Sequence, residues 1–248
     1  EKHGMLRARP AELVSGTLSV ISVRMDYLPG DTAAARRLAR MTGAPILGFG
    51  PPTAGRSSIM QRLAESGDIG GGEGMDAGFL PDIQLRDGEA ISSPEWRITA
   101  LHTPGHFAGH LSFAAGDEIF CGDIVLGWSS TLISPPDGDL SDYMRSLSRL
   151  TELAPRRLLP AHGGPIEHPF PRLSELADHR RHRTAQILTA LQSGPASADS
   201  LAQEIYDVDP RLARAASRNV LAHLIALYEL GAVVTRSDIS INSVFRLA

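Results

Sequence analysis

Apolar and polar residues follow one another in blocks that predict alternating strands and helices. Short apolar runs bounded by Gly and Pro predict strands at 17–23, 44–49, 95–101, 110–114, 118–121 and 157–160. Short helices are predicted over 11–14 and 31–41, and apolar residues three and four apart predict one over 141–153 with Ser141 as its N-cap. A helix between the first two strands implies that they run parallel, and a tight turn makes a hairpin of 110–121.

Two segments depart from this alternation. From 51 to 82 the periodicity is lost and Gly, Ser and Asp dominate, which predicts a long loop, either a surface insertion or a cover over an active site. Beyond residue 171, helical patterns over 172–192, 197–205 and 211–230 precede strand-like runs at 232–235 and 243–247, the order of a winged helix. We therefore expect a first domain over 1–171 and a second over 172–248.

Composition is that of a soluble globular protein. The 248 residues are 42% hydrophobic and 21% charged, with a net charge of −4, which does not suggest a nucleic-acid partner. Cys121 is the single cysteine, so an intramolecular disulfide is excluded and a cytoplasmic location is expected. Lys2 is the single lysine, a bias typical of a GC-rich bacterial genome. No apolar run is long enough to span a membrane.

Candidate chemistry gathers in three short stretches that each follow an apolar strand. His102 and His106 lie in the first, with His110 close behind, while Asp123 follows Gly122 and His162 precedes Gly163. Neutral imidazole nitrogens with a carboxylate are what a borderline metal ion needs. These stretches therefore predict a metal site.

The order of His106, Asp123 and His162, with the flanking glycines, resembles the later part of the metallo-β-lactamase superfamily of metal-dependent hydrolases. The loop 128–144 and the C-terminal helices resemble its branch with a C-terminal winged-helix-like domain. The resemblance implies an α/β fold, an αββα sandwich of two mixed sheets with helices outside. It also implies that His106 belongs to the first metal position, that His162 belongs to the second, and that Asp123 bridges both. His102 and His110 are expected to have supporting roles.

The family's first motif, His-x-His-x-Asp-His, is degenerate in this chain. Aligned on Asp26, its three histidines are replaced by Ser22, Arg24 and Tyr27. An arginine is always charged and only donates hydrogen bonds, so it cannot bind a cation. The first metal position is therefore expected to be lost.

The second position keeps Asp26, Asp123 and His162, with Tyr27 or water beside them. This set predicts one divalent ion, zinc or else iron or manganese; the alternative is a scaffold that has lost its metal. The guanidinium of Arg24 is predicted to replace the missing cation and to pair with Asp123 or with an anionic group of the ligand. The alternative is that Arg24 turns to solvent.

The predicted function is hydrolysis of a small-molecule ester, thioester, lactone, amide or phosphodiester by a metal-activated water, which Asp26 would orient or deprotonate. The competing hypothesis is a catalytically degenerate protein that binds a ligand or partner through the same cleft. The substitutions at Ser22, Arg24 and Tyr27 argue against a full two-metal site.

Two further expectations concern partners. Arg180, Arg181 and Arg183 form the only basic cluster of the second domain, so we expect it to wall the cleft or an oligomer interface rather than to bind nucleic acid. About ten residues precede the first predicted helix, where the family has several strands. If the natural chain begins here, one sheet lacks its opening strands and leaves an edge open to a partner, for which a homodimer is the candidate.

Overall fold

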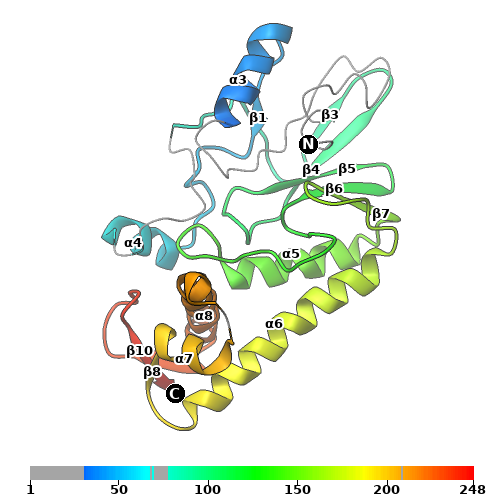
Figure 1. Ribbon diagram of the computed structural model, residues 1–248. Coiled ribbons are helices and arrows are strands. Elements are labelled where there is room, and N and C mark those ends of the chain that lie inside the picture. The colour runs from blue at the N-terminus through cyan, green and yellow to red at the C-terminus, as the bar shows by residue number, and fades with distance from the viewer. Residues whose placement is uncertain (1–30, 68, 70–77, 208) are drawn as a thin grey trace.

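Among the described residues, a five-stranded mixed sheet forms the centre of the N-terminal part (Figure 1). The computed structural model describes residues 31–67, 69, 78–207 and 209–248, so the elements expected over 11–14 and 17–23 lie outside it. The strands run in the order β3-β4-β5-β6-β7, antiparallel except for the parallel β6–β7 pair. Their bounds are Ala90–Ser92, Arg97–His102, Leu111–Ala115, Glu118–Gly122 and Arg157–Pro160. The last four strands and the hairpin confirm the sequence prediction.

Side chains alternate between the two faces of this sheet and so build two cores. Leu101 and Leu158 face a cluster supplied by α5 (Leu140–Glu152) and α6 (Pro169–Leu191). Phe113 points to the opposite face, towards β1 (Leu47–Gly48), which pairs in parallel with β2 (Ile83–Gln84). Figure 1 shows α5 and α6 on the side of the sheet away from β1 and from α3 (Asp31–Thr42). The layered α/β arrangement is the one expected.

The helix predicted over 141–153 is α5, but its predicted N-cap is wrong. Asp139 caps the helix, since its side chain accepts a hydrogen bond from the backbone N–H of Asp142. The hydroxyl of Ser141 donates instead to Glu229 over 2.7 Å. Asp139 and Ser141 are both of residue types that form N-caps. Because the hydroxyl of Ser141 binds a distant helix, Asp139 is the N-cap of α5.

The long loop predicted over 51–82 contains a helix, α4 (Ser58–Ser66), so that prediction is wrong in part. Ser57 caps α4 by accepting from the backbone N–H of Met60, and Gly67 ends it in the left-handed conformation. Met60 and Leu63 are buried against the C-terminal helices. Such a short apolar stripe carries little periodicity of its own, and tertiary packing stabilises the helix.

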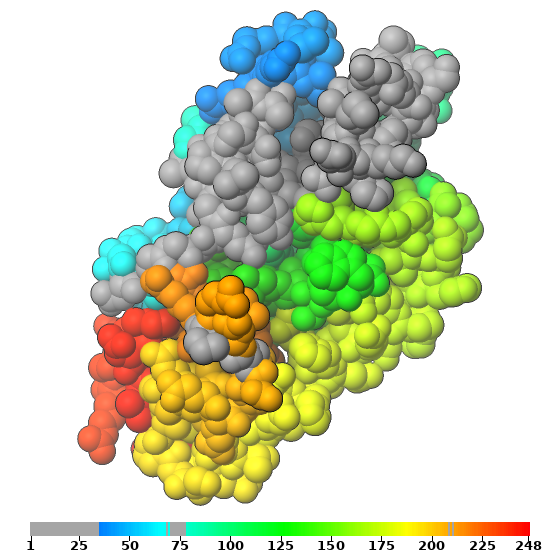
Figure 2. Space-filling view, in the orientation of Figure 1, coloured from blue at the N-terminus to red at the C-terminus, as the bar shows by residue number. Residues whose placement is uncertain are grey.

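The C-terminal part is a helical unit closed by a small antiparallel sheet, as predicted for a winged helix. After α6 come α7 (Ala198–Ile205), a 3-10 helix (Pro210–Leu212) and α8 (Ala213–Glu229). The strands β8 (Ala196–Ser197), β9 (Val233–Thr235) and β10 (Val244–Leu247) pair in the order β8-β10-β9. Figure 2 shows α4, in cyan, lying against this part.

Helix α6 packs against elements of both parts, and α8 also contacts α5. The boundary predicted between residues 171 and 172 falls in the first turn of α6, which begins at Pro169. Among the described helices, none is both long and apolar enough to cross a bilayer.

His223, buried in α8, makes folding sensitive to acid. Burial lowers the pKa of its imidazole to about 3, and Nδ1 lies 2.9 Å from the hydroxyl of Thr184. The pKa of a histidine in an unfolded chain is about 6.5. Between about pH 3 and pH 6.5, the unfolded state therefore binds more protons than the folded state. The contribution of His223 to the free energy of unfolding is therefore complete above about pH 6.5. It decreases as the pH falls, by up to about 1.4 kcal/mol per pH unit.

Replacing His223 by Asn keeps a group that can meet Thr184 and removes the titration. His223→Asn should make the free energy of unfolding fall less steeply between about pH 6 and 4, by about 1.4 kcal/mol per pH unit. Urea unfolding across this range measures the slope. The matched control is His182→Asn on the exposed surface of α6, expected to keep the wild-type slope. Equal slopes in all three proteins would contradict the assignment.

Candidate functional site

The parallel strands β6 and β7 bring Asp123 and His162 to one edge of the sheet. Gly122 pairs with Pro160 at the carboxyl ends of the two strands, so the residues that follow leave the sheet side by side. The carboxylate of Asp123 is fully buried, and its Oδ1 lies 3.8 Å from Nε2 of His162, whose side chain is 31% exposed. A buried carboxylate beside a partly exposed imidazole forms a pair that opens to solvent on the His162 side.

His106 reaches the same region through a close approach of backbone to helix. Gly105, which precedes it, has φ +139, and a Cβ there would lie 2.7 Å from the Cβ of Tyr143 in α5 and closer still to its Cα. The backbone N–H of Asp139 donates to the carbonyl of Gly105 over 2.9 Å. Only glycine tolerates both the conformation and the contact, so Gly105 sets where His106 leaves the chain.

The ring of His106 is held by a backbone carbonyl. Its Nδ1 lies 3.0 Å from the carbonyl oxygen of Leu132. Because a carbonyl can only accept, Nδ1 donates the proton of this bond, and in the neutral ring Nε2 then carries the lone pair. Metal-binding histidines usually have their second nitrogen fixed in this way.

The side chains at this edge are of the types that bind divalent ions. Asp123 provides a negative charge that is costly to bury without a cation or a partner, and the two histidines provide imidazole nitrogens. Among the residues that the structure describes, no group of three or more His, Cys, Asp or Glu stands close enough to hold a metal. The described residues therefore do not make up a metal site by themselves.

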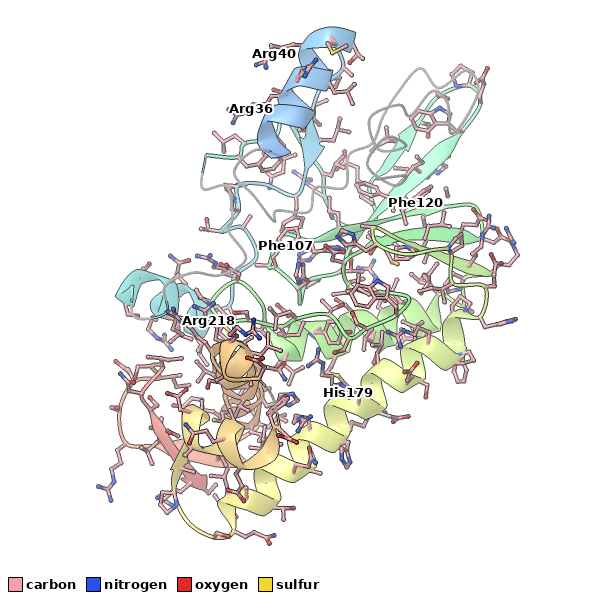
Figure 3. All side chains as sticks on the ribbon, in the orientation of Figure 1. Arg36, Arg40, Phe107, Phe120, His179 and Arg218 are labelled. Carbon is pink, nitrogen blue, oxygen red and sulfur yellow. The ribbon has the colours of Figure 1, made fainter. Side chains whose placement is uncertain are left out.

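His102 and His110 support the segment that carries His106. The ring of His102 stacks on Phe49 with centroids 3.9 Å apart, and its Nε2 donates to the carbonyl of Ala108. His110 is completely buried, and desolvation, with smaller contributions from two neighbouring histidines, lowers its pKa to about 3. Its ring lies edge-on to Phe107, which is near the middle of the molecule in Figure 3. A neutral, buried His110 is suited to packing rather than to proton transfer.

The polar contacts of His110 continue into the sheet. Nδ1 lies 3.0 Å from the hydroxyl of Thr103, which is 2.7 Å from the hydroxyl of Ser112. All three side chains are buried. These contacts tie the segment before His106 to β5.

An exposed tryptophan lies beside Gly163, the residue that follows His162. Trp128 is 74% exposed, and a Cβ on Gly163 would come within 3.3 Å of its ring. Arg172 fixes the backbone on both sides of it, by donating to the carbonyls of Leu126 and Ser129 over 2.9 and 2.5 Å. Trp128 therefore presents an apolar surface on a loop that hydrogen bonds from Arg172 hold in place, near the candidate metal ligands.

The three arginines that are clustered in the sequence of the second domain have different surroundings in the structure. Arg180 is only 3% exposed and points inward, whereas Arg181 is exposed and pairs with Asp178. Arg183 lies 3.8 Å above the ring of Tyr206. The helical spacing along α6 indicates that Arg180 is buried, because it follows buried Ala177 by three residues and therefore lies on the same face of the helix.

The sequence does not indicate two further contacts of the site. Thr131 contacts Asp123, and the carbonyl of Leu132 contacts His106. A backbone acceptor has no sequence signature. Of the predicted site residues, the structure places His106, Asp123 and His162 around one edge of the sheet. Ser22, Arg24, Asp26 and Tyr27 lie outside the described residues.

Comparison with known proteins identifies relatives of both parts. A family model described as the metallo-beta-lactamase superfamily matches residues 28–162, more than half of the chain. A second, the beta-lactamase associated winged helix domain, matches 197–240. A metallo-beta-lactamase family protein from Thermus thermophilus has a similar structure, with TM-score 0.63 and 26% identity over 82% of this chain and 72% of that one.

Curated relatives are similar over shorter spans. The Beta-lactamase-like protein 2 homolog of Drosophila melanogaster is 32% identical over 139 residues, which are 54% of this chain and 46% of that protein. An Atrochrysone carboxyl ACP thioesterase from Aspergillus fumigatus is 36% identical over 109 residues, 43% of this chain and 33% of the relative. The chain thus matches less than half the length of each.

Proposed function

Because the chain belongs to the metallo-β-lactamase superfamily, with a C-terminal winged helix domain, we propose that it is a hydrolase with a reduced, one-metal site. The proposed substrate is a small-molecule ester, thioester, lactone, amide or phosphodiester. One observation carries the proposal: the fully buried carboxylate of Asp123 lies 3.8 Å from the imidazole of His162, at the ends of parallel strands.

The proposed roles follow from the chemistry of each side chain. Asp123 and His162 are proposed to bind the ion with Asp26, and His106, whose Nδ1 is bound by the carbonyl of Leu132, is proposed to contribute to the same site. A divalent ion, for which zinc is proposed and iron or manganese would serve, lowers the pKa of water and polarises a carbonyl or phosphoryl oxygen. Asp26 orients the water or accepts its proton.

Arg24 and Tyr27 are proposed to contact the substrate or to replace the charge of the lost first metal. These assignments rest on alignment with the family motif. The proposed site holds one ion, because Ser22 and Arg24 replace the two histidines that would complete the first metal position.

A thioester is the substrate class that the relatives support best. The relative from Aspergillus fumigatus is named as an Atrochrysone carboxyl ACP thioesterase. Trp128 offers an apolar surface beside Gly163 that suits an acyl or aryl group. A cytoplasmic location, a homodimer and the absence of a nucleic-acid partner are further parts of the proposal.

The second candidate function is binding without catalysis through the same cleft. The observation that favours it is the degenerate motif, in which Ser22, Arg24 and Tyr27 replace three histidines. A protein of this kind would keep the scaffold of His106, Asp123 and His162 and hold its ligand without turnover.

A hydrolysis panel with controlled metal content tests the proposal. Protein freed of metal by chelation would be assayed with an aryl ester, an acyl thioester, a lactone, an anilide and a phosphodiester, before and after addition of zinc, iron(II) or manganese. The proposal expects turnover of at least one substrate that is lost on chelation and restored by one metal. No turnover with any metal, together with retained binding of an acyl thioester, would favour the second function.

A further inference from the structure

The segment between β6 and α5 contacts both His106 and Asp123. We name residues 131–139 the bridging segment. The carbonyl of Leu132 accepts from Nδ1 of His106 over 3.0 Å. The hydroxyl of Thr131, a buried residue, donates to the backbone carbonyl of Asp123 over 2.7 Å. A shift of this backbone would therefore turn the His106 ring and move Asp123.

Arg180 ties the bridging segment to the C-terminal part. Its Nη2 donates to the carbonyl of Thr131, and its Nη1 donates to Oδ1 of Asn219 in α8 over 2.9 Å. The amide of Asn219 donates in turn to the hydroxyl of Tyr206 over 2.5 Å. In Figure 1, α6 runs from the side of α5 towards α8. One chain of hydrogen bonds thus reaches from the winged helix to the peptide before Leu132.

An arginine is a costly choice for this position. Burial of its charge lowers the pKa of Arg180, although the guanidinium stays charged, and an apolar residue of similar volume usually stabilises a core as well or better. What an apolar residue lacks is the fork of donors. The guanidinium meets the Thr131 carbonyl and Asn219 at once, while lying 5.4 Å from the ring centre of Tyr143.

Tyr143 links the same contact to the start of the His106 segment. It packs directly against Gly105, the residue that precedes His106. Arg180 therefore contacts both supports of His106, the bridging segment that binds its ring and the α5 residue against which its backbone lies.

We propose that Arg180 is a positioning residue for hydrolysis, which holds Thr131 and Leu132 so that the His106 ring and Asp123 keep their orientation. By this role the winged helix domain becomes part of the hydrolytic site. The inference rests on the proposed function, and Arg180 itself contacts neither substrate nor ion.

The test compares Arg180→Met, Arg180→Lys and the control Arg181→Met in the full chain. Arg181 is the exposed neighbour on α6. Each variant is examined for kcat and KM on the best substrate of the panel, for its urea midpoint, and for the ¹⁵N ring signals of His106 in metal-free protein at pH 8. Comparison with His106→Gln assigns those signals.

Wild type should show His106 protonated at Nδ1. Arg180→Met should give a mixture of the two ring tautomers and a kcat lower by roughly 10- to 100-fold, with KM within about twofold, because small misplacements of reacting groups cost rate more than binding. Arg180→Lys, which keeps one donor, should fall between Arg180→Met and wild type in both readouts. Arg181→Met should match wild type. If Arg180→Met does not fold, Arg180→Lys decides by the same two readouts.

A purely structural role predicts a different result. In that case the urea midpoint falls while the His106 signals and kcat of the Arg180 variants remain those of wild type, and the proposal is overturned. The ring signals need no turnover. If wild type hydrolyses nothing in the panel, the proposed function fails, and the His106 tautomer alone decides whether Arg180 positions that ring.

Discussion

Asp123→Asn should lower kcat/KM for the best substrate by roughly a thousandfold. The substitution keeps the size of the side chain and removes the charge that would bind the ion with His162, 3.8 Å away. Loss of a metal removes several kcal/mol of transition-state stabilisation, and each ~1.4 kcal/mol is tenfold in rate. Steady-state kinetics at saturating zinc would measure the loss.

Asp117→Asn is the matched control, since Asp117 lies on the surface between β5 and β6 and pairs with Arg156. It should change kcat/KM by less than about twofold, as exposed ion pairs contribute little. If Asp123→Asn retained most of the activity, Asp123 would not be a ligand of the catalytic ion.

Gly105→Ala should destabilise the fold by about 2–6 kcal/mol. Its φ of +139 is strained for any residue with a Cβ, which costs about 1–3 kcal/mol. A Cβ would also lie 2.7 Å from the backbone nitrogen of Tyr143, so the first turn of α5 must move, at a further cost of about 1–3 kcal/mol. Urea denaturation measures the sum.

Gly116→Ala separates the two contributions. Gly116 has φ +62 in the β5–β6 turn, and a Cβ there would meet nothing within 4 Å. This variant should lose only about 1 kcal/mol, the conformational cost alone. Equal losses in the two variants would mean that the packing of Gly105 on α5 does not hold the His106 segment.

Local patterns predicted the elements of this fold where one face is buried. Strands β4 to β7 and helices α5 to α8 follow apolar spacings that survive in the structure. Helix α4 was not predicted, because only Met60 and Leu63 of this short helix are fully buried and the segment around it is rich in Gly and Ser. The three nearby arginines of α6 were grouped by composition alone. The helical spacing of the apolar residues indicates that Arg180 is on the buried face of α6.

The candidate site divides in a similar way. His106, Asp123 and His162 could be recognised because strand ends and flanking glycines mark them in the sequence. The contacts that orient them could not, since they use the carbonyls of Leu132 and Asp123 and the fold of a distant helix. Backbone acceptors become specific only when tertiary structure brings a donor to them.

The number of ions bound per chain is the most direct test of the proposed one-metal site. Elemental analysis of protein purified without chelator, followed by zinc titration of the metal-free form, gives the number of ions per chain. We expect about one tightly bound equivalent at saturation, held by a carboxylate and an imidazole, and its loss in Asp123→Asn. Two equivalents per chain, or one equivalent that persists in Asp123→Asn, would contradict this proposal.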